Sequence, residues 1–231
     1  MTTYMSDSVA ERLHLFLGKA NLDTLHGEQY KQFSILLSLI IRWNARTNLT
    51  AIRNEEGILE RHFVESIACA QALPAGTKSL LDFGSGAGFP GIPIAICHPE
   101  IAVTLAESQG KKAAFLREAV RSIALMAKVH TARAETLKSQ FDCVTLRAVD
   151  KMERAARSAS RLVSPGGWLA LMTTDHDRPA IVASIGNEFV WSPPLSLPGA
   201  DYRVLSLGKR SSSPPSELLS DENPHQAPEV G

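Results

Sequence analysis

Apolar residues in the first third of the chain recur with the period of a helix. In residues 8–17, 28–43 and 55–72 they stand three or four positions apart, which is the spacing of one face of an α-helix. A polar connection over residues 44–53 separates the second segment from the third. The pattern predicts a helical N-terminal extension over residues 1–73 that packs on the rest of the fold.

From residue 79 onward, short apolar runs alternate with segments of helical periodicity. This alternation predicts an α/β core over residues 74–210, with a mostly parallel sheet covered by helices on both faces. The last two strands flank the Pro-rich residues 193–198, and we expect them to form an antiparallel hairpin at one edge. The predicted strands are 79–83, 101–106, 127–131, 141–146, 168–173, 188–192 and 202–207. The predicted helices are 91–97, 110–124, 134–138, 150–163 and 178–187, with a turn over residues 164–167.

The first predicted strand runs into a loop with four glycines, between Leu80 and Gly91. Glycine adopts positive φ and lets a backbone approach a ligand closely. A strand, such a turn and a helix start hold nucleotide-like cofactors in open α/β sheets. The second strand ends in Glu107, 23 positions after Gly84. A ribose-binding carboxylate belongs at about 20 residues from the first glycine, so Glu107 is a candidate for that role.

The spacing of the loop distinguishes between cofactors. Phe89 stands where the dinucleotide fingerprint has its third glycine, and the Lys-Ser/Thr pair of a P-loop is absent. Asp82 followed by Gly84 and Gly86 suits a cofactor with an amino-acid end and a ribose but no phosphate, which is S-adenosylmethionine. We expect Asp82 to face its ammonium group through a water or a backbone turn, and Glu107 its ribose hydroxyls. A dinucleotide site and a tight turn without a ligand are the alternatives.

The ends of the later strands add further candidates, because ligands bind outside the carboxyl ends of the strands in open α/β sheets. The backbone of Ala134 and Glu135, with the Glu135 side chain, is placed to bind adenine. Glu135 has an alternative role as a helix cap, and Arg147 as a structural partner of Glu107 or Glu135. His62, alone on the third helix, is interpreted as a surface or core residue.

Composition narrows the class of protein. Of the 231 residues, 44% are hydrophobic and 21% charged, as in soluble globular proteins. Cys69, Cys97 and Cys143 lack C-x-x-C spacing, which argues against a metal site or a disulfide framework and fits a reducing cytoplasm. The start lacks a basic segment before an apolar run, so we expect no signal peptide. The longest apolar stretch, residues 35–43, is too short to span a membrane.

Charge is unevenly distributed along the chain, although its formal sum is zero. Residues 211–231 contain four acids and no Lys or Arg, which leaves 24 basic against 20 acidic residues, or +4, for residues 1–210. A mildly basic body permits an RNA partner. The acidic, Pro- and Ser-rich tail is predicted to be disordered.

Several motifs together resemble one family. The sequence is similar to the bacterial ribosomal RNA small subunit methyltransferase G family, also called glucose-inhibited division protein B, over roughly residues 30–175. The similarity rests on Trp43-Asn44, Asn48-Leu49-Thr50, Arg61-His62-Phe63-Val64-Glu65-Ser66, the run from Asp82 to Pro93, Glu107-Ser108, Lys111-Lys112, Phe115-Leu116, Arg133-Ala134-Glu135 and Arg147-Ala148.

The resemblance implies a class I S-adenosylmethionine-dependent methyltransferase, with a Rossmann-like, mostly parallel seven-stranded sheet. It implies methyl transfer to N7 of one guanine in 16S rRNA near the decoding site. We expect the substrate to be the small ribosomal subunit or an assembly intermediate, and the protein to be a monomer. Guanine N7 carries an in-plane lone pair, so no catalytic base is required, and Arg147 is expected to position the base or a phosphate. The expected cofactor contacts are Asp82, Gly84, Gly86, Phe89, Glu107, Ala134, Glu135 and Arg147.

The chain departs from the family pattern in two places. A Lys-Gly pair often follows the fifth strand, where this chain has Met172-Thr173-Thr174-Asp175, and the acidic tail is unusual. Three other functions are weighed against the leading one. A small-molecule methyltransferase would share the cofactor site, and a ribosome assembly factor would bind the cofactor without catalysis. An NAD-dependent oxidoreductase would need a Tyr-Lys or His pair that the sequence does not offer.

Overall fold

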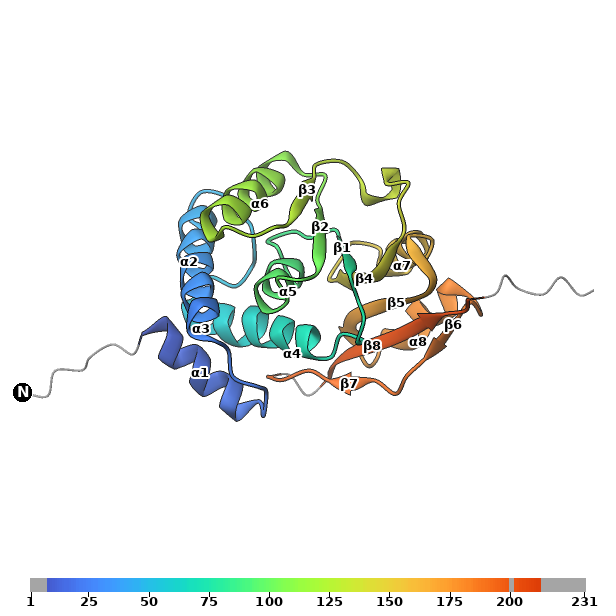
Figure 1. Cartoon of the computed structure of the whole chain (residues 1–231), viewed down its shortest axis with the longest axis horizontal. Coiled ribbons are helices and arrows are strands. Elements are labelled where there is room, and N and C mark those ends of the chain that lie inside the picture. The colour runs from blue at the N-terminus through green and yellow to red at the C-terminus, as the bar shows by residue number, and fades with distance from the viewer. Residues whose placement is uncertain (1–7, 200–201, 213–231) are drawn as a thin grey trace, which may run out of the picture.

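The computed structural model describes residues 8–199 and 202–212, and one sheet organises them (Figure 1). Its strand order is β3-β2-β1-β4-β5-β8-β6, with β7 paired to β8. The neighbours from β3 to β5 pair in parallel, whereas β8 is antiparallel to both β5 and β6. The strands are β1 (Ser79–Phe83), β2 (Ala102–Ala106), β3 (Lys128–His130), β4 (Phe141–Arg147), β5 (Val163–Thr174), β6 (Phe189–Trp191), β7 (Leu195–Ser196) and β8 (Arg203–Arg210).

The alternating pattern therefore predicted the parallel sheet and its antiparallel edge correctly. The expected number of seven strands was wrong by one, because β7 is two residues long and too short to give a periodic signal. The predicted turn over residues 164–167 was also wrong. These residues lie within β5, whose pairing with β4 shifts register beside Phe141 and Cys143. Gly166, at φ 76°, allows this irregularity within the strand.

Helices cover the two faces of the sheet unequally. On one face lie α1 (Val9–Lys19), α2 (Gly27–Asn44), α4 (Glu65–Gln71), α5 (Gly91–Cys97) and α6 (Gly110–Ile123), and on the other α7 (Met152–Ser160) and α8 (Arg178–Ile185). Successive side chains of a strand point to opposite faces of the sheet, so one strand contributes apolar residues to the cores on both faces. In β1, Leu80 belongs to the first apolar cluster, and Leu81 and Phe83 belong to the second.

The N-terminal helices share their core with the sheet. Leu13, Phe33 and Phe63 are fully buried in the same cluster as Leu80 and Leu105 of the strands. The predicted extension thus packs on the α/β core through a continuous apolar interior, although the boundary at residue 73 stays a prediction. At the other end, β8 is followed by residues 211–212, and the predicted disordered tail lies outside the described residues from 213 onward.

The predicted third helix has an internal irregularity. It begins as α3 (Glu55–Gly57), continues as a π-helical segment, η1 (Ile58–Val64), and ends as α4. Wider turns of this kind occur frequently at functional sites. A second short element, the 3₁₀ turn η2 (Ala134–Thr136), follows β3 where a helical turn was expected.

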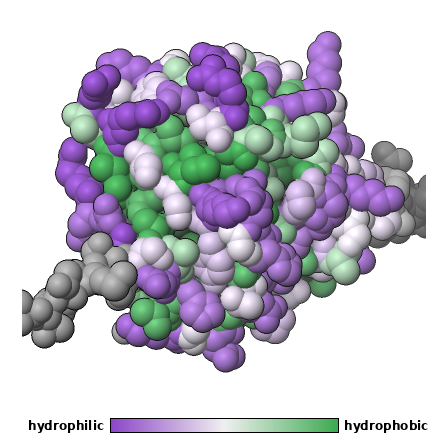
Figure 2. Space-filling model, turned by 60° about the vertical axis from the view of Figure 1, so that its left-hand side comes forward, coloured by the Kyte–Doolittle hydropathy of each residue, from purple (hydrophilic) through white to green (hydrophobic). Residues whose placement is uncertain are grey.

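Hydrophobic side chains also reach the surface, and Figure 2 shows them gathered in one area that hydrophilic side chains border. Leu15, Ile35 and Met126 are among the large apolar residues that are exposed. None of the helices that the structure describes is both long and apolar enough to cross a membrane.

Candidate functional site

The glycine loop connects β1 to α5 and is fixed by its own backbone. The Ser85 N–H donates to the Ala106 carbonyl (2.9 Å) and the Gly88 N–H to the Ser85 carbonyl (2.7 Å). Gly88 has φ 88°, and a Cβ there would lie 2.4 Å from Ile92 Cδ1. Glycine is therefore required at this position for conformation and for space.

Asp82 lies beneath this loop and stabilises it from inside. Its Oδ2 accepts from the Gly91 N–H (3.1 Å) and its Oδ1 from the Thr145 hydroxyl (3.0 Å). A Cβ on Gly91 would lie 2.6 Å from Oδ2, so this contact also depends on a glycine. Burial raises the pKa of Asp82 to about 6 despite these hydrogen bonds. Asp82 does not line the cavity above the loop. Asp82 thus meets the loop and not the cavity directly, and its expected action on the cofactor's ammonium group through a water or a backbone turn stays a prediction.

Glu107 follows β2 and faces the same loop from the side. Its Oε2 accepts from the Gly86 N–H (3.0 Å) and its Oε1 from the Gln109 N–H (2.7 Å). Each carboxylate oxygen can accept a second hydrogen bond. Glu107 therefore holds the loop and keeps acceptor capacity for a ligand.

A cavity of about 620 Å³, here called the glycine-loop cavity, opens at the carboxyl ends of β1, β2 and β4. This is where ligands bind in open α/β sheets, and the volume is in the range of small-molecule sites. The structure brings all the predicted cofactor residues except Asp82 to this cavity. They are Gly84, Gly86, Phe89, Glu107, Ala134, Glu135 and Arg147.

The N-terminal extension supplies the facing wall of the cavity, through the connection after α2 and through η1. Leu49, Thr50 and His62 line it. The His62 ring stacks on Phe89, with centroids 4.6 Å apart and planes at 19°, and its Nε2 lies 2.7 Å from the Thr50 hydroxyl oxygen. Burial, together with Arg147 and other nearby arginines, lowers the pKa of His62 to about 3, so the ring is neutral.

The interpretation of His62 as a surface or satisfied core residue stays a prediction, and the structure adds that the ring lies at the wall of this cavity. His62 lies on the π-helical segment η1, whose course periodicity alone did not reveal. The available signal was the Arg61-His62 pair within the family-like motif.

Arg147, the last residue of β4, is anchored to the N-terminal helices. Its guanidinium donates to Glu65 Oε2 (2.5 Å), to the Arg61 carbonyl (2.6 Å) and to the Ser66 hydroxyl (3.3 Å). The Glu65 side chain is fully buried and also accepts from Arg203 (3.0 Å). Arg147 was expected to pair with Glu107 or Glu135 if its role were structural. That pairing was wrong, because the partner comes from a helix 82 residues earlier in the sequence.

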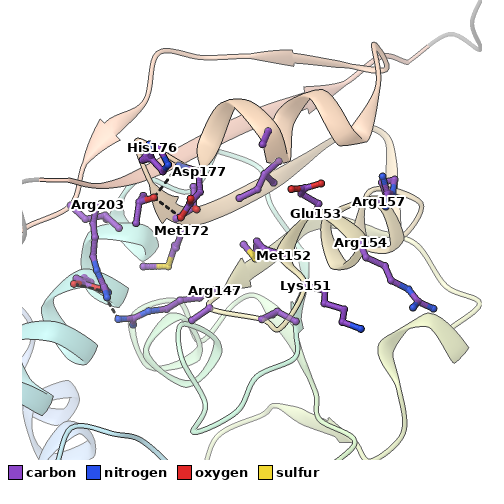
Figure 3. Close-up of a pocket in the computed structure, with 18 residues that line it drawn as sticks. Arg147, Lys151, Met152, Glu153, Arg154, Arg157, Met172, His176, Asp177 and Arg203 are labelled. Atoms are coloured by element: carbon purple, nitrogen blue, oxygen red, sulfur yellow. Dashed lines mark hydrogen bonds and ion pairs between the residues drawn. The ribbon is translucent and has the colours of Figure 1, made fainter.

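A second cavity, of about 710 Å³, lies on the other side of Arg147 and is here called the arginine cavity. Figure 3 shows that Arg147 and Arg203 lie at one end of it, whereas Lys151, Arg154 and Arg157 lie at the other. The residues found in both cavities are Arg147, Ala148, Val149, Lys151 and Arg154. The loop after β4 therefore forms the boundary between them.

The departure from the family pattern after the fifth strand lies in the arginine cavity. Met172, Thr173 and Thr174 line it, and the Thr174 hydroxyl donates to Asp177 Oδ2 (2.7 Å). The positive charge at this cavity comes from Arg147 and Arg203, together with the residues at the start of α7. A substrate in this cavity would therefore meet positive charge even though no lysine follows β5 in this chain.

Comparison with known proteins identifies the family. A family model described as rRNA small subunit methyltransferase G matches residues 29–185, from α2 to the end of α8. The chain belongs to this family. A ribosomal RNA small subunit methyltransferase G of Roseiflexus sp. (strain RS-1) is 40% identical over 195 residues, which cover 78% of this chain and 83% of the relative. The protein of that name from Stenotrophomonas maltophilia (strain K279a) is 39% identical, covering 83% of this chain and 90% of its own.

A solved structure supports the fold class independently. The SAM-dependent methyltransferase from Aquifex aeolicus superposes with a TM-score of 0.54 at 14% identity, covering 67% of this chain and 93% of that one. With the strand order described above, this chain has the fold of class I S-adenosylmethionine-dependent methyltransferases, as the sequence predicted.

Proposed function

We propose that this protein transfers the methyl group of S-adenosylmethionine to N7 of a guanine in 16S rRNA. The observation that carries the proposal is the pair of cavities joined at the loop after β4. One cavity has the glycine loop and Glu107, as a cofactor site requires. The other is lined by five Lys or Arg side chains against three carboxylates, an excess of positive charge that suits a nucleotide. The family described above, whose name specifies ribosomal RNA of the small subunit, supports the choice of substrate.

The glycine-loop cavity fits this cofactor by its chemistry. Glu107 offers free acceptor capacity to the ribose hydroxyls, and the exposed backbone of the loop allows close approach of the amino-acid end. Ala134 is buried at the cavity wall, beside Glu135, and this wall would hold the adenine. The remaining proposed contacts are Gly84, Gly86, Phe89 and Arg147.

The bound cofactor supplies an electrophilic methyl group, and the protein supplies position. Guanine N7 attacks with a lone pair that carries no proton, so no residue needs to act as a base. His62 is neutral, with Nε2 hydrogen-bonded to Thr50, and is not needed in that role. Among the described residues, no group of three or more His, Cys, Asp or Glu is arranged to hold a metal ion. Holding the reacting atoms in line contributes roughly 7–11 kcal/mol to such reactions.

Arg147 is the residue that we propose positions the base. It lines both cavities, and its anchoring to Glu65 and Ser66 fixes its orientation. Three of its hydrogen bonds go to the protein, and a guanidinium has five N–H donors. A remaining donor can bind guanine O6 and leave N7 free. We further propose that the protein acts as a monomer in the cytoplasm on the small subunit or its assembly intermediate.

The test uses tritiated S-adenosylmethionine and small ribosomal subunits from a strain that lacks this gene. Label is expected in one 16S guanine, at a position cleaved by N7-specific chemistry. Naked 16S rRNA and late assembly intermediates, tested in parallel, identify the preferred form of the substrate. Cofactor binding without label in any RNA would overturn the proposal and favour a small-molecule acceptor.

A further inference from the structure

One face of α7 is strongly basic, and the site described above uses only its beginning. Lys151, Arg154, Arg157 and Arg161 follow one another at intervals of three or four residues, so they share one side of the helix, with Glu153, four residues before Arg157, as the acid at its border. All four are exposed. We call this set the α7 basic face. From Lys151 to Arg161 it extends for about 15 Å at 1.5 Å per residue.

These charges do not serve the packing of the helix. The opposite side of α7 packs on the sheet through Ala155, Ala156 and Ala159, which are buried. Within the described part of the chain, no side chain of the α7 basic face makes a hydrogen bond or ion pair. Some surface arginines have partners, as Arg210 has in Glu188 (3.0 Å), whereas Arg117 and Arg121 on α6 have none among the described residues. What distinguishes the α7 basic face is that its unpaired cations continue from the two cavities of the site.

The start of the helix strengthens this argument. Lys151 is the residue before the first turn of α7, and it has φ 51° and ψ 58°. A cation at a helix N-terminus opposes the helix dipole, and a left-handed backbone is strained for any residue other than glycine. Strain of this kind is concentrated at functional sites. Lys151 lies at the mouth of both cavities.

The α7 basic face leads away from the proposed target base. Lys151 and Arg154 line both cavities, and Arg157 lines the arginine cavity at the end opposite Arg203 (Figure 3). Arg161 lies farther along, where it lines the next hollow of the surface with Lys138. The four side chains thus continue outward from the point where a guanine would enter.

We propose that the α7 basic face docks the phosphates of the RNA strand that adjoins the target guanine. The proposal rests on the proposed function and assigns it a docking surface. Lys and Arg bind phosphates by charge and by displacing counterions, and such contacts fix position without reading sequence. A membrane surface fits less well, because no large hydrophobic residue of α7 is exposed.

The test compares two double variants of the full-length protein. Arg157→Ala/Arg161→Ala removes two cations that lie outside the glycine-loop cavity. Arg117→Ala/Arg121→Ala is the matched control, because both of these arginines are exposed on α6 and make no ion pair with the described residues. Binding of 16S rRNA and of small subunits is measured at several salt concentrations, together with the KM for subunits and the Kd for S-adenosylmethionine.

We expect the α7 variant to bind RNA about tenfold more weakly, with a matching rise in KM and an unchanged Kd for the cofactor. The slope of log affinity against log salt should fall by about 1.4, at about 0.7 for each lost contact with single-stranded RNA. The control should behave as the wild type. An α7 variant with the RNA affinity and salt slope of the wild type would overturn the docking surface. So would a variant whose binding to polyglutamate, a polyanion without phosphates, falls by the same factor as its binding to RNA.

These outcomes separate the two proposals, because RNA binding is measured without turnover. If the wild type methylates subunits and the α7 variant binds RNA normally, only the docking surface fails. If the wild type methylates no RNA while the α7 variant loses RNA affinity selectively, the proposed methylation fails and the docking surface stands.

Discussion

The two walls of the glycine-loop cavity are built in different ways. The sheet wall consists of the glycine loop and Glu107, with Asp82 beneath the loop, and its contacts are mostly hydrogen bonds to backbone groups at most 21 residues away in sequence. The helical wall consists of Thr50, His62 and the Glu65 cluster. It reaches the sheet through side-chain contacts with Phe89, Arg147 and Arg203, the last of them 138 residues from Glu65. The first wall is a local motif, whereas the second exists only in the complete fold.

The largest expected effect tests the helical wall through Glu65→Gln. Glu65 is fully buried, with three guanidiniums around its carboxylate, from Arg61, Arg147 and Arg203. Removing its charge leaves the buried guanidinium of Arg147 uncompensated, which costs about 3–5 kcal/mol. We expect a large fall in the free energy of unfolding, measured with urea.

The matched control is Glu188→Gln, which removes the same charge from an exposed pair with Arg210. Exposed pairs contribute at most about 1 kcal/mol. Equal losses of stability in the two variants would contradict the view that the Glu65 cluster holds the helical wall.

A smaller effect is expected from Arg147→Lys, which keeps the charge but removes the fork that reaches Glu65, Ser66 and the Arg61 carbonyl together. A misplaced positioning group costs roughly 10²-fold in rate. We therefore expect kcat for small subunits to fall by about that factor, measured by methyl incorporation. Unfolding is followed by circular dichroism to establish that the variant is folded. Wild-type turnover would remove the positioning role.

The sheet wall is tested by Glu107→Gln. Hydrogen bonds to a charged group contribute about 1.5–3 kcal/mol, so the Kd for S-adenosylmethionine should rise roughly tenfold or more. Calorimetric titration measures it, with S-adenosylhomocysteine as a second ligand that has the same ribose. Glu100→Gln is a control, because that acid is exposed and does not line the cavity. An unchanged Kd in the Glu107 variant would exclude the ribose contact.

The smallest effect is a pH dependence that distinguishes the walls. Burial lowers the pKa of His62 to about 3, against about 6.5 in an unfolded chain. Below pH 6.5 the unfolded state binds a proton that the folded state does not, so His62 reduces stability as the pH falls, by up to about 1.4 kcal/mol per pH unit. Asp82 acts in the opposite direction. Its pKa is raised to about 6, so it adds stability as the pH falls from about 6 towards 4.

His62→Gln isolates the first of these terms. Relative to the wild type, the variant should gain about 1 kcal/mol in unfolding free energy between pH 6.5 and 5.5. Urea unfolding at several pH values measures the difference. A difference that does not change with pH would show that His62 is protonated as easily in the folded protein as in the unfolded chain.

The contrast between the walls also explains what the sequence could predict. The alternation of strands and helices, the glycine loop and Glu107 are specified by patterns that a short window contains. Glu65 was read only as part of a helical motif, because nothing near it in sequence indicates that its partners are Arg147 and Arg203. The contacts of Asp82 could not be predicted for a related reason. A strand-end carboxylate is recognisable in sequence, but the direction in which it points depends on Thr145 of a neighbouring strand.

The position of Arg203 has a consequence for biosynthesis. The ribosome makes the helical wall first, but the carboxylate of Glu65 receives its last guanidinium only when β8 has been translated and added to the sheet. A nascent chain that stops before this strand has a glycine loop but lacks part of the cluster that orients Arg147. The order of synthesis therefore makes the completion of the helical wall a late event relative to the glycine loop, because it waits for a strand that is translated about 120 residues after that loop.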